Sequence, residues 1–241
     1  MFEKLSSKND LNRQFSDAVF ANDLEKVKNL FDEKNESAPN IELELVSGTA
    51  ILIAAMKKNW ELFEVLYGLN ANLDVKLISN DWHLIHECVK NAPFKIVEAI
   101  SEYCELDAQT ETGKTALMVA IREKNKIVAE FLIKTGKLNL SIYDNDGNNA
   151  AHYAAKSGQN DIFMLLIKEG VPLNKKNKID KYPADLIEDE FFKSSIPKIV
   201  KQEKIIKEEN VSQKLEETPE NHIPPEKEKL KGLSSIKRKP D

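Results

Sequence analysis

Residues 146–170 read DGNNAAHYAAKSGQNDIFMLLIKEG, and they decide the fold of this chain. The stretch predicts a turn at Asp146 and Gly147, a short alanine-rich helix, a loop around Gly158 and a second helix with apolar residues every three or four positions. Two short helices of this kind cannot bury their apolar faces alone. The stretch therefore predicts a unit that stacks on similar neighbours.

The same pattern opens five units along the chain. The units begin at Thr49, His83, Thr115, Asn149 and Tyr182, so successive starts lie 34, 32, 34 and 33 residues apart. A period of about 20 to 50 residues is typical of stacked-repeat proteins, in which each unit buries its apolar face on its neighbours. The sequence therefore predicts one elongated solenoid, whose units we number one to five.

Residues at the helix ends support these boundaries. Thr49, Thr115 and Asn149 stand where the first helix of a unit begins, and their side-chain oxygens can accept hydrogen bonds from its free N–H groups. Gly136 and Gly170 follow the second helices of units three and four, where a left-handed residue commonly ends a helix. We expect an extended arm and a reversal after each of these glycines, so that the reversals project as a row of hairpins.

The units resemble the ankyrin repeat, whose pattern is Thr-Pro-Leu-His-x-Ala-Ala, a glycine loop, and then an Ile-Val-x-Leu-Leu-Leu helix that ends at glycine. Unit four carries most of this pattern in register, at His152, Ala154, Ala155, Gly158, Ile162, Leu165, Leu166, Ile167, Gly170 and Asn174. No unit has the Thr-Pro-Leu-His start intact, and unit two departs furthest, with Tyr103 where the family has glycine. Over roughly residues 10–200, the resemblance implies an all-α ankyrin-repeat solenoid of helix-turn-helix repeats with hairpin loops.

The resemblance and a change in composition near Lys201 divide the chain. We expect an N-terminal helical cap with its connection, four repeats, a C-terminal capping repeat and a charged, largely disordered tail, over residues 1–45, 46–78, 79–111, 112–145, 146–178, 179–201 and 202–241. In the cap, Leu11, Phe15, Ala18 and Val19 recur at helical spacing. The tail is rich in Lys, Glu and Pro, with too little apolar content to fold alone.

Composition narrows the function classes. The chain has 241 residues and a net charge of −5, and residues 201–241 hold 10 of its 35 basic and 9 of its 40 acidic residues. The remaining acidic body disfavours nucleic acid as a partner. Two cysteines suit a reducing compartment, and no apolar run reaches the roughly 20 residues of a membrane span. We expect a monomer without a membrane span, cytoplasmic or secreted into the cytosol of a host cell.

Candidate catalytic and metal sites are weak. His83, His86, Cys88 and Cys104 could form a zinc site, but their spacing matches none of the usual zinc fingers. The resemblance instead gives His86 and His152 a structural role as hydrogen-bonding links between hairpin and helix. Cys88 is expected to be buried, which does not suit a nucleophile. The glycines are scattered and form no phosphate-binding loop, so we expect no catalytic residue, no metal and no cofactor.

The resemblance implies a function in protein binding. In this family, partners are held by the hairpin tips and by the outward positions of the first helices, which line a concave face. The matching positions give the candidate partner-binding residues Trp82, Asn80, Glu111, Lys114, Arg122, Tyr143, Asn145, Asp146, Asn148, Lys156, Lys178 and Lys181. The expected function is that of a scaffold, adaptor or competitive inhibitor that binds a protein partner without catalysis.

Trp82 has two interpretations. It replaces a residue that is usually polar at a hairpin tip, and an exposed tryptophan is a common binding anchor. Alternatively, its ring folds back onto unit two, which has the most degenerate pattern. Both interpretations remain open from the sequence.

Charge changes along the row of hairpins. The hairpins of units three and four carry the acidic residues Asp107, Glu111, Asp144 and Asp146, whereas the next hairpin carries Lys175, Lys176, Lys178 and Lys181. This change predicts a partner of matching opposite polarity. Asp144, Asp146 and Asp180 are also residues that commonly form turns, and that interpretation is the stronger one.

Two further hypotheses concern the setting of the protein. The degenerate repeats, the Lys-, Asn- and Ile-rich composition and the charged tail are similar to those of ankyrin-repeat effectors that intracellular bacteria inject into host cells, which implies host proteins as partners. The alternative function is that of a cryptic enzyme, or of the targeting subunit of an enzyme, with its chemistry in residues 35–44 or in unit two. Labelling of Cys88 by a thiol probe would favour that alternative.

Overall fold

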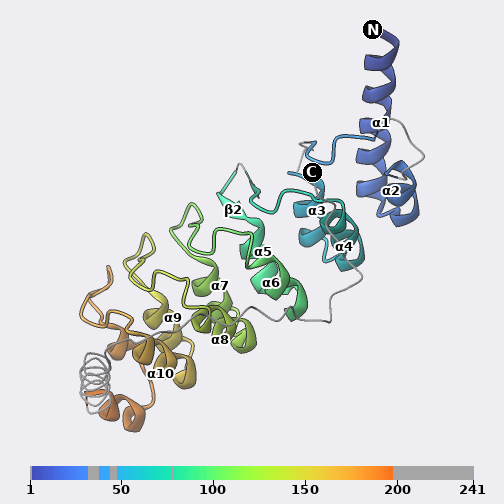
Figure 1. The fold of residues 1–241 in the computed structure, drawn as a ribbon. Helices are drawn as coiled ribbons and strands as arrows, with labels where there is room; N and C mark the ends of the chain where they lie inside the picture. Colours follow the sequence, from blue (N-terminus) through green and yellow to red (C-terminus); the bar gives the residue numbers. More distant parts are fainter. Residues whose placement is uncertain (1, 32–37, 44–47, 78, 198–241) are drawn as a thin grey trace, which may run out of the picture.

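The chain folds into two layers of short helices stacked in one row (Figure 1). The computed structural model describes residues 2–31, 38–43, 48–77 and 79–197. The first layer holds α1 (Phe2–Ala21), α3 (Ala50–Met56), α5 (Leu84–Asn91), α7 (Ala116–Arg122), α9 (Ala150–Lys156) and the 3₁₀ helix η1 (Pro183–Leu186). The second layer holds α2 (Leu24–Leu30), α4 (Trp60–Gly68), α6 (Phe94–Ile100), α8 (Lys126–Lys134) and α10 (Asn160–Glu169). Each element of the first layer contacts the next one, which confirms the predicted solenoid.

Small buried side chains in the first layer and large ones in the second layer pack the helices together. Ala120 and Ala154 in the first layer are fully buried, and their short side chains let successive helices approach closely. Leu132 and Leu166 in the second layer are also fully buried and fill the space between units. Burial of one such leucine stabilises the fold by about 2 kcal/mol. Because each unit meets only its neighbours, the core is a continuous strip along the row.

Four hairpins follow one another along one side of the row (Figure 1). We name each after the unit that it enters, so that the second, third, fourth and fifth hairpins comprise residues 75–83, 108–115, 142–149 and 175–182. The second contains the only strands in the described chain, β1 (Lys76–Leu77) and β2 (Trp82–His83), which pair antiparallel with Lys76 opposite His83. It is one residue longer than the other three.

Backbone hydrogen bonds join each hairpin to the one before it. The N–H of Glu111 donates to the carbonyl of Asn80 over 2.9 Å, and the N–H of Asn145 donates to the carbonyl of Thr112 over 3.1 Å. The N–H of Lys178, in the fifth hairpin, donates to a carbonyl of the fourth in the same way, over 2.8 Å. The predicted row of hairpins is therefore a connected strip.

A left-handed residue separates the two helices of most units. It is Asn22 between α1 and α2, Lys58 in unit one, Lys124 in unit three and Gly158 in unit four, with φ between 56° and 67°. Unit two differs, since Ala92 is extended there and precedes Pro93. The N-terminal helix pair thus uses the same turn as the repeats, although its sequence carries little of their pattern.

The predicted helix ends are confirmed with one exception. The Thr115 and Asn149 side chains accept from backbone N–H groups of α7 and α9 over 3.4 and 3.2 Å. Gly136 and Gly170 have φ of 65° and 90°, as a left-handed helix end requires. Thr49 stands at the start of α3 as predicted, but the expected capping bond is absent, because its buried hydroxyl makes no hydrogen bond to α3 or to any other described residue. An unpaired buried hydroxyl costs stability instead of adding it.

Aromatic contacts hold the helices at both ends of the described chain. Phe15 of α1 packs edge-on against Phe31, with ring centroids 5.3 Å apart. After η1, residues 190–197 are helical, and Phe192 packs edge-on against Phe163 of α10 at 6.1 Å. The first helix is longer than expected, since it begins at Phe2. The expected tail, residues 202–241, lies outside the described residues.

Candidate protein-binding face

Two buried histidines fasten hairpins to helices. Nδ1 of His86 and of His152 accepts from the backbone N–H three residues earlier, over 3.0 and 3.2 Å. Nε2 lies 3.1 Å from the carbonyl of Lys114 in His86 and 3.2 Å from that of Lys181 in His152. Because a carbonyl can only accept, Nε2 carries the proton in both rings. These contacts give both histidines the structural role that the family resemblance implied.

Burial keeps both rings neutral. The side chains of His86 and His152 are almost fully inaccessible to solvent. Burial lowers the pKa of His86 to about 4, and His83 nearby adds to this effect. Burial also lowers the pKa of His152. Neither ring offers a charged or open group to a partner at neutral pH, so both act by positioning the hairpins.

Asp144 organises the fourth hairpin from inside. Its carboxylate accepts from the backbone N–H groups of Asp146 and Asn148 over 2.9 and 2.7 Å, and from the hydroxyl of Tyr153 over 2.6 Å. The side chain is buried. Burial and this carboxylate raise the pKa of Tyr153. Asp144 is a turn former, as the stronger interpretation of the sequence had it, and adds no accessible charge to the hairpin tips.

Two asparagines that were predicted to bind a partner also connect hairpins. The Asn145 amide donates to the carbonyl of Glu111 over 2.8 Å. The Asn148 side chain accepts from the amide of Asn177 over 2.8 Å. Asn145 is exposed and Asn148 is half-buried. The sequence did not reveal this second role, because each bond reaches a residue about one repeat away.

Trp82 is half-buried and folds back onto α5. Its indole N–H donates to a carboxylate oxygen of Glu87 over 3.2 Å, and its ring lies 5.4 Å from that of His86. The second oxygen of Glu87 accepts from the Asn91 amide over 2.6 Å. Asn80 is exposed, and its side chain accepts from the Trp82 N–H over 3.1 Å. The structure thus favours the second interpretation of Trp82, packing onto unit two, although part of the side chain stays accessible.

The predicted cationic residues differ in whether their charged groups are paired with other residues of the chain. Arg122 pairs with Glu123 over 2.7 Å, and the half-buried Lys114 donates to the hydroxyl of Thr112 over 2.9 Å. The ammonium groups of Lys156, Lys178 and Lys181 are exposed and take part in no ion pair or side-chain hydrogen bond within the described part of the chain.

The remaining predicted residues lie on the third to fifth hairpins. Glu111 and Asp146 are exposed at their tips. Tyr143 is half-buried, and the ammonium of Lys175 lies 3.9 Å from its ring centroid, a cation–π contact. Burial raises the pKa of Tyr143. Its ring is therefore covered on one face by the fifth hairpin.

Sequence reasoning missed Tyr153 as a surface residue of α9. Tyr153 is half-buried, and the positive charge of Arg122 acts against the rise in the pKa of its hydroxyl. It occupies the variable position between histidine and alanine in the repeat pattern, which faces outward from the first helix. That position was a signal available in the sequence, and unit two places Glu87 there.

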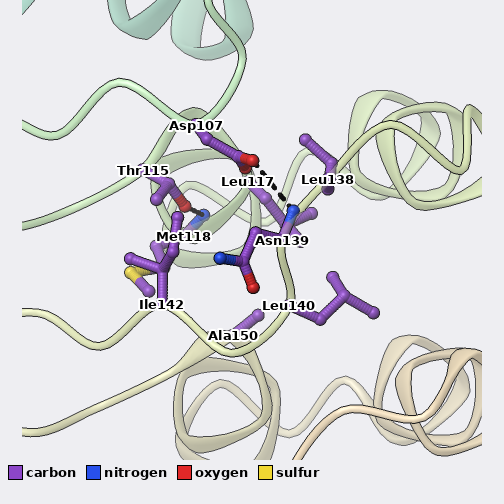
Figure 2. A pocket seen from close by; sticks show the side chains of 9 residues that line it. All are labelled: Asp107, Thr115, Leu117, Met118, Leu138, Asn139, Leu140, Ile142 and Ala150. Carbon is purple, nitrogen blue, oxygen red and sulfur yellow. Dashed lines mark hydrogen bonds between the residues drawn. The ribbon is translucent and has the colours of Figure 1, made fainter.

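A small pocket lies between α7 and residues 138–142 (Figure 2). Its volume is about 10 Å³, which is room for roughly one water molecule. Asp107 closes one side, where its carboxylate accepts from the N–H of Asn139 over 2.9 Å. The pocket is a gap in the packing and too small for an organic ligand.

The described residues were also compared with the requirements of metal sites and membrane spans. Nowhere among them do three His, Cys, Asp or Glu side chains gather closely enough to hold a metal ion. Their helices are all too short or too polar to cross a bilayer. Cys88 is fully buried, and burial raises the pKa of its thiol.

Comparisons with known proteins agree with this architecture. The sequence model of a family described as ankyrin repeats in three copies matches residues 85–177. Delta-latroinsectotoxin-Lt1a of Latrodectus tredecimguttatus is 32% identical over 78 residues, which is 32% of this chain and only 6% of that protein. The crystal structure of EF0377, an ankyrin-repeat protein, superposes with a TM-score of 0.64 at 18% identity, over 79% of this chain and 98% of that one. Together with the two-layer stack, the hairpins and the histidine links, these matches show ankyrin repeats at residues 85–177 and the fold of an ankyrin-repeat solenoid.

Proposed function

We propose that this chain is a non-catalytic protein-binding module, which holds its partner on the hairpins and on the outward side of the first-layer helices. We call this surface the hairpin face. Ankyrin repeats are modules of protein–protein interaction. The finer role, as scaffold, adaptor or competitive inhibitor, belongs to the same proposal, because each of these roles needs only a bound partner.

The observation that carries the proposal is a register of exposed side chains on successive units. Lys90, Arg122 and Lys156 each stand seven residues after the start of their unit, at the ends of α5, α7 and α9. All three are exposed. Basic residues at helix C-termini also interact favourably with the helix dipole, which accounts for their position. Arg122 is paired with Glu123, so Lys90 and Lys156 are the two whose ammonium groups make no ion pair within the described residues.

Charge reversal on this face tests the proposal. The variant Lys156→Glu/Lys181→Glu should lose most of the partner captured by the wild type in an affinity pull-down, because both side chains are exposed and unpaired. Lys134→Glu/Lys168→Glu, on α8 and α10 of the second layer, is the matched control and should bind as the wild type does. Equal capture by both double variants would overturn the assignment of the face.

The alternative function, a cryptic enzyme or the targeting subunit of one, would have its chemistry in residues 35–44 or in unit two. Residues 35–37 and 44 lie outside the described residues, and in unit two the candidate reactive group is Cys88. Cys88 would have to be a thiolate, but burial favours its thiol form. We expect iodoacetamide to label Cys88 in the folded chain much more slowly than in the chain unfolded in urea. Rapid labelling of the folded chain would revive the alternative.

The setting of the protein belongs to the proposal as well. We propose that it acts on host proteins after injection by an intracellular bacterium, and the composition of its repeats and tail supports this. A translocation assay that compares the full chain with residues 1–201 tests the role of the tail. Undiminished delivery of the shortened chain would exclude a signal in residues 202–241.

A further inference from the structure

On the C-terminal half of the hairpin face, fewer acidic side chains are open to a partner than the sequence alone suggests. Four carboxylates there are engaged within the chain: Asp107 by the N–H of Asn139, Asp144 by Tyr153, Asp180 by Lys176 and Asp185 by the N–H of Tyr182. Asp107 and Asp144 keep their charge but are half-buried and buried, so the acidic groups of the third and fourth hairpins that are exposed to a partner are Glu111 and Asp146. A partner with two opposite charge blocks is no longer required.

Three lysines at the boundary of units four and five make no ion pair or side-chain hydrogen bond with any residue that the structure describes. Lys178 and Lys181 flank the tip of the fifth hairpin, and Lys156 ends α9. His152 connects them, because its Nε2 binds the carbonyl of Lys181 and it precedes Lys156 by about one helical turn. Three ammonium groups that meet no counter-ion among the described residues thus lie on adjoining elements of the face, on a chain whose net charge is −5.

An exposed apolar side chain lies between two of these lysines. Ile179, at the tip of the fifth hairpin, is 69% exposed. The residues at the same place in the third and fourth hairpins are polar, Thr112 and Asp146. A large apolar residue is uncommon in a turn, where Gly, Pro, Asn, Asp and Ser dominate, and nothing in the described chain covers this one. The tip combines one apolar contact with two positive charges.

From this combination we infer that the tip of the fifth hairpin, with Lys156 below it, docks an acidic segment of the partner protein that carries an apolar residue for Ile179. The inference rests on the proposed function and names the chemistry of its partner. Carboxylates of the segment meet Lys156, Lys178 and Lys181, while its apolar side chain covers Ile179. Opposite charge accelerates the encounter, and the apolar contact slows dissociation.

A single-stranded nucleic acid fits this surface less well, although it is also an anion. Such ligands stack their bases on open aromatic rings. The rings of Tyr143 and Tyr182 carry the ammonium groups of Lys175 and Lys176, at 3.9 and 5.2 Å from their centroids.

Synthetic peptides test the inference on the full chain. The probe is a fluorescein-labelled peptide of about twelve residues, in which Glu alternates with Ser around one central Leu. Fluorescence anisotropy should detect its binding, and binding should weaken as salt is added. A peptide with Gln in place of Glu should bind at least about tenfold more weakly. Absence of any difference between the two peptides would overturn the inference.

Variants of the chain locate the contact. Lys178→Gln/Lys181→Gln should weaken binding of the acidic peptide about tenfold, and Lys134→Gln/Lys168→Gln should leave it unchanged. Ile179→Ser should weaken binding of the Leu peptide but not of a peptide with Ser in its place. The free side chains at 178, 179 and 181 predict unchanged melting by circular dichroism. Equal effects of the two double variants would place the peptide elsewhere.

Two outcomes separate this inference from the proposed function. Capture of a protein partner that depends on Lys90 and Trp82 but not on Lys178 and Lys181 would keep the function and overturn the acidic dock. A partner that binds no part of the hairpin face would overturn both. Tighter binding of oligothymidylate than of the acidic peptide, abolished by Lys178→Gln/Lys181→Gln, would replace the inference with a nucleic-acid site.

Discussion

A single proton on His86 decides how the third hairpin is held. Nε2 needs its proton to bind the carbonyl of Lys114, whereas Nδ1 must stay free to accept from the N–H of His83. A second proton on Nδ1 would place two N–H groups against each other. The ring is therefore compatible with the fold only in its neutral form.

The stability of the protein should consequently depend on pH through His86. Its pKa falls from an ordinary 6.5 to about 4 in the fold, so the unfolded chain binds the proton more readily between these values. The contribution is complete above pH 6.5 and is lost as pH falls toward 4, by roughly 3 kcal/mol. Urea unfolding at several pH values measures it. His86→Gln is the control, since the difference in slope between it and the wild type isolates this ring.

Lys124 carries strain that a glycine would remove. Its φ of 58° is left-handed, as is that of Gly158 in the same turn of unit four. A left-handed backbone costs a non-glycine residue about 1 to 2 kcal/mol, and glycine loses up to about 1 kcal/mol through its freer unfolded state. We expect Lys124→Gly to raise the free energy of unfolding by about 0.5 kcal/mol. Lys90→Gly, within α5, should lower the free energy of unfolding by about 1 kcal/mol. If Lys124→Gly also lowered it, the backbone of Lys124 would not be strained.

Single residues were predictable from the sequence when their partners lie within one turn. The roles of Thr115 and Gly170 follow from helix-end chemistry alone, and the turn-forming role of Asp144 follows from its residue type. The role of His152, which binds Lys181 29 residues away, was implied by the family resemblance. The bonds of Asp144 to Tyr153 and of Trp82 to Glu87 needed the structure, because only the folded hairpin brings these groups within reach. The candidate site changed for the same reason, since hydrogen bonds between hairpins engage Asn145 and Asn148.

At the scale of elements, the hairpins depend on close approach of one backbone to the next. A Cβ added at Gly113 would lie 2.7 Å from the backbone nitrogen of Asn145 and 2.9 Å from Cα of Asp144. Gly136 also has a positive φ, but a Cβ there would meet nothing within 4 Å. A comparison of alanine substitutions at the two glycines therefore separates the free-energy cost of a left-handed backbone from the cost of a clash with the next hairpin.

Gly113→Ala should therefore destabilise the protein more than Gly136→Ala. Gly136→Ala should cost about 1 kcal/mol, the strain of the left-handed backbone alone. Gly113→Ala adds a clash with the next hairpin, for a total of about 3 kcal/mol. Denaturant unfolding with tryptophan fluorescence compares them. Equal losses would mean that the third and fourth hairpins separate without cost.

At the scale of the whole molecule, stability is a sum along the row of units. Inner units such as α7 with α8 have a neighbour on both sides, whereas α1 with α2 packs on one side only. We expect hydrogen exchange to be slowest in α7 and α9 and fastest in α2 and residues 190–197. Mass spectrometry of peptic peptides measures this. Uniform protection along the chain would indicate unfolding as a single unit.

The solenoid as a whole was predictable because its periodicity lies in the sequence itself. The five unit starts and the two layers follow from apolar spacing, without knowledge of any distant contact. A turn at Asn22 in the N-terminal helix pair was predictable, but its equivalence to the turns of the repeats was not, since Asn22 stands where the repeats have lysine or glycine and its φ of 61° shows the equivalence. Sequence periodicity identifies units with the same residue pattern, whereas the structure also identifies units that have the same backbone conformation without that pattern.

The bonds between hairpins also bear on how such a chain can change length over evolution. Every junction uses the same pair of groups, an N–H from the later hairpin and a carbonyl from the earlier one. A duplicated unit inserted at a junction could accept from the N–H of the later hairpin and donate to the carbonyl of the earlier one. The flanking units would keep their other contacts. Gain or loss of whole units would thus alter the reach of the surface in fixed increments, while leaving the chemistry of each remaining hairpin intact.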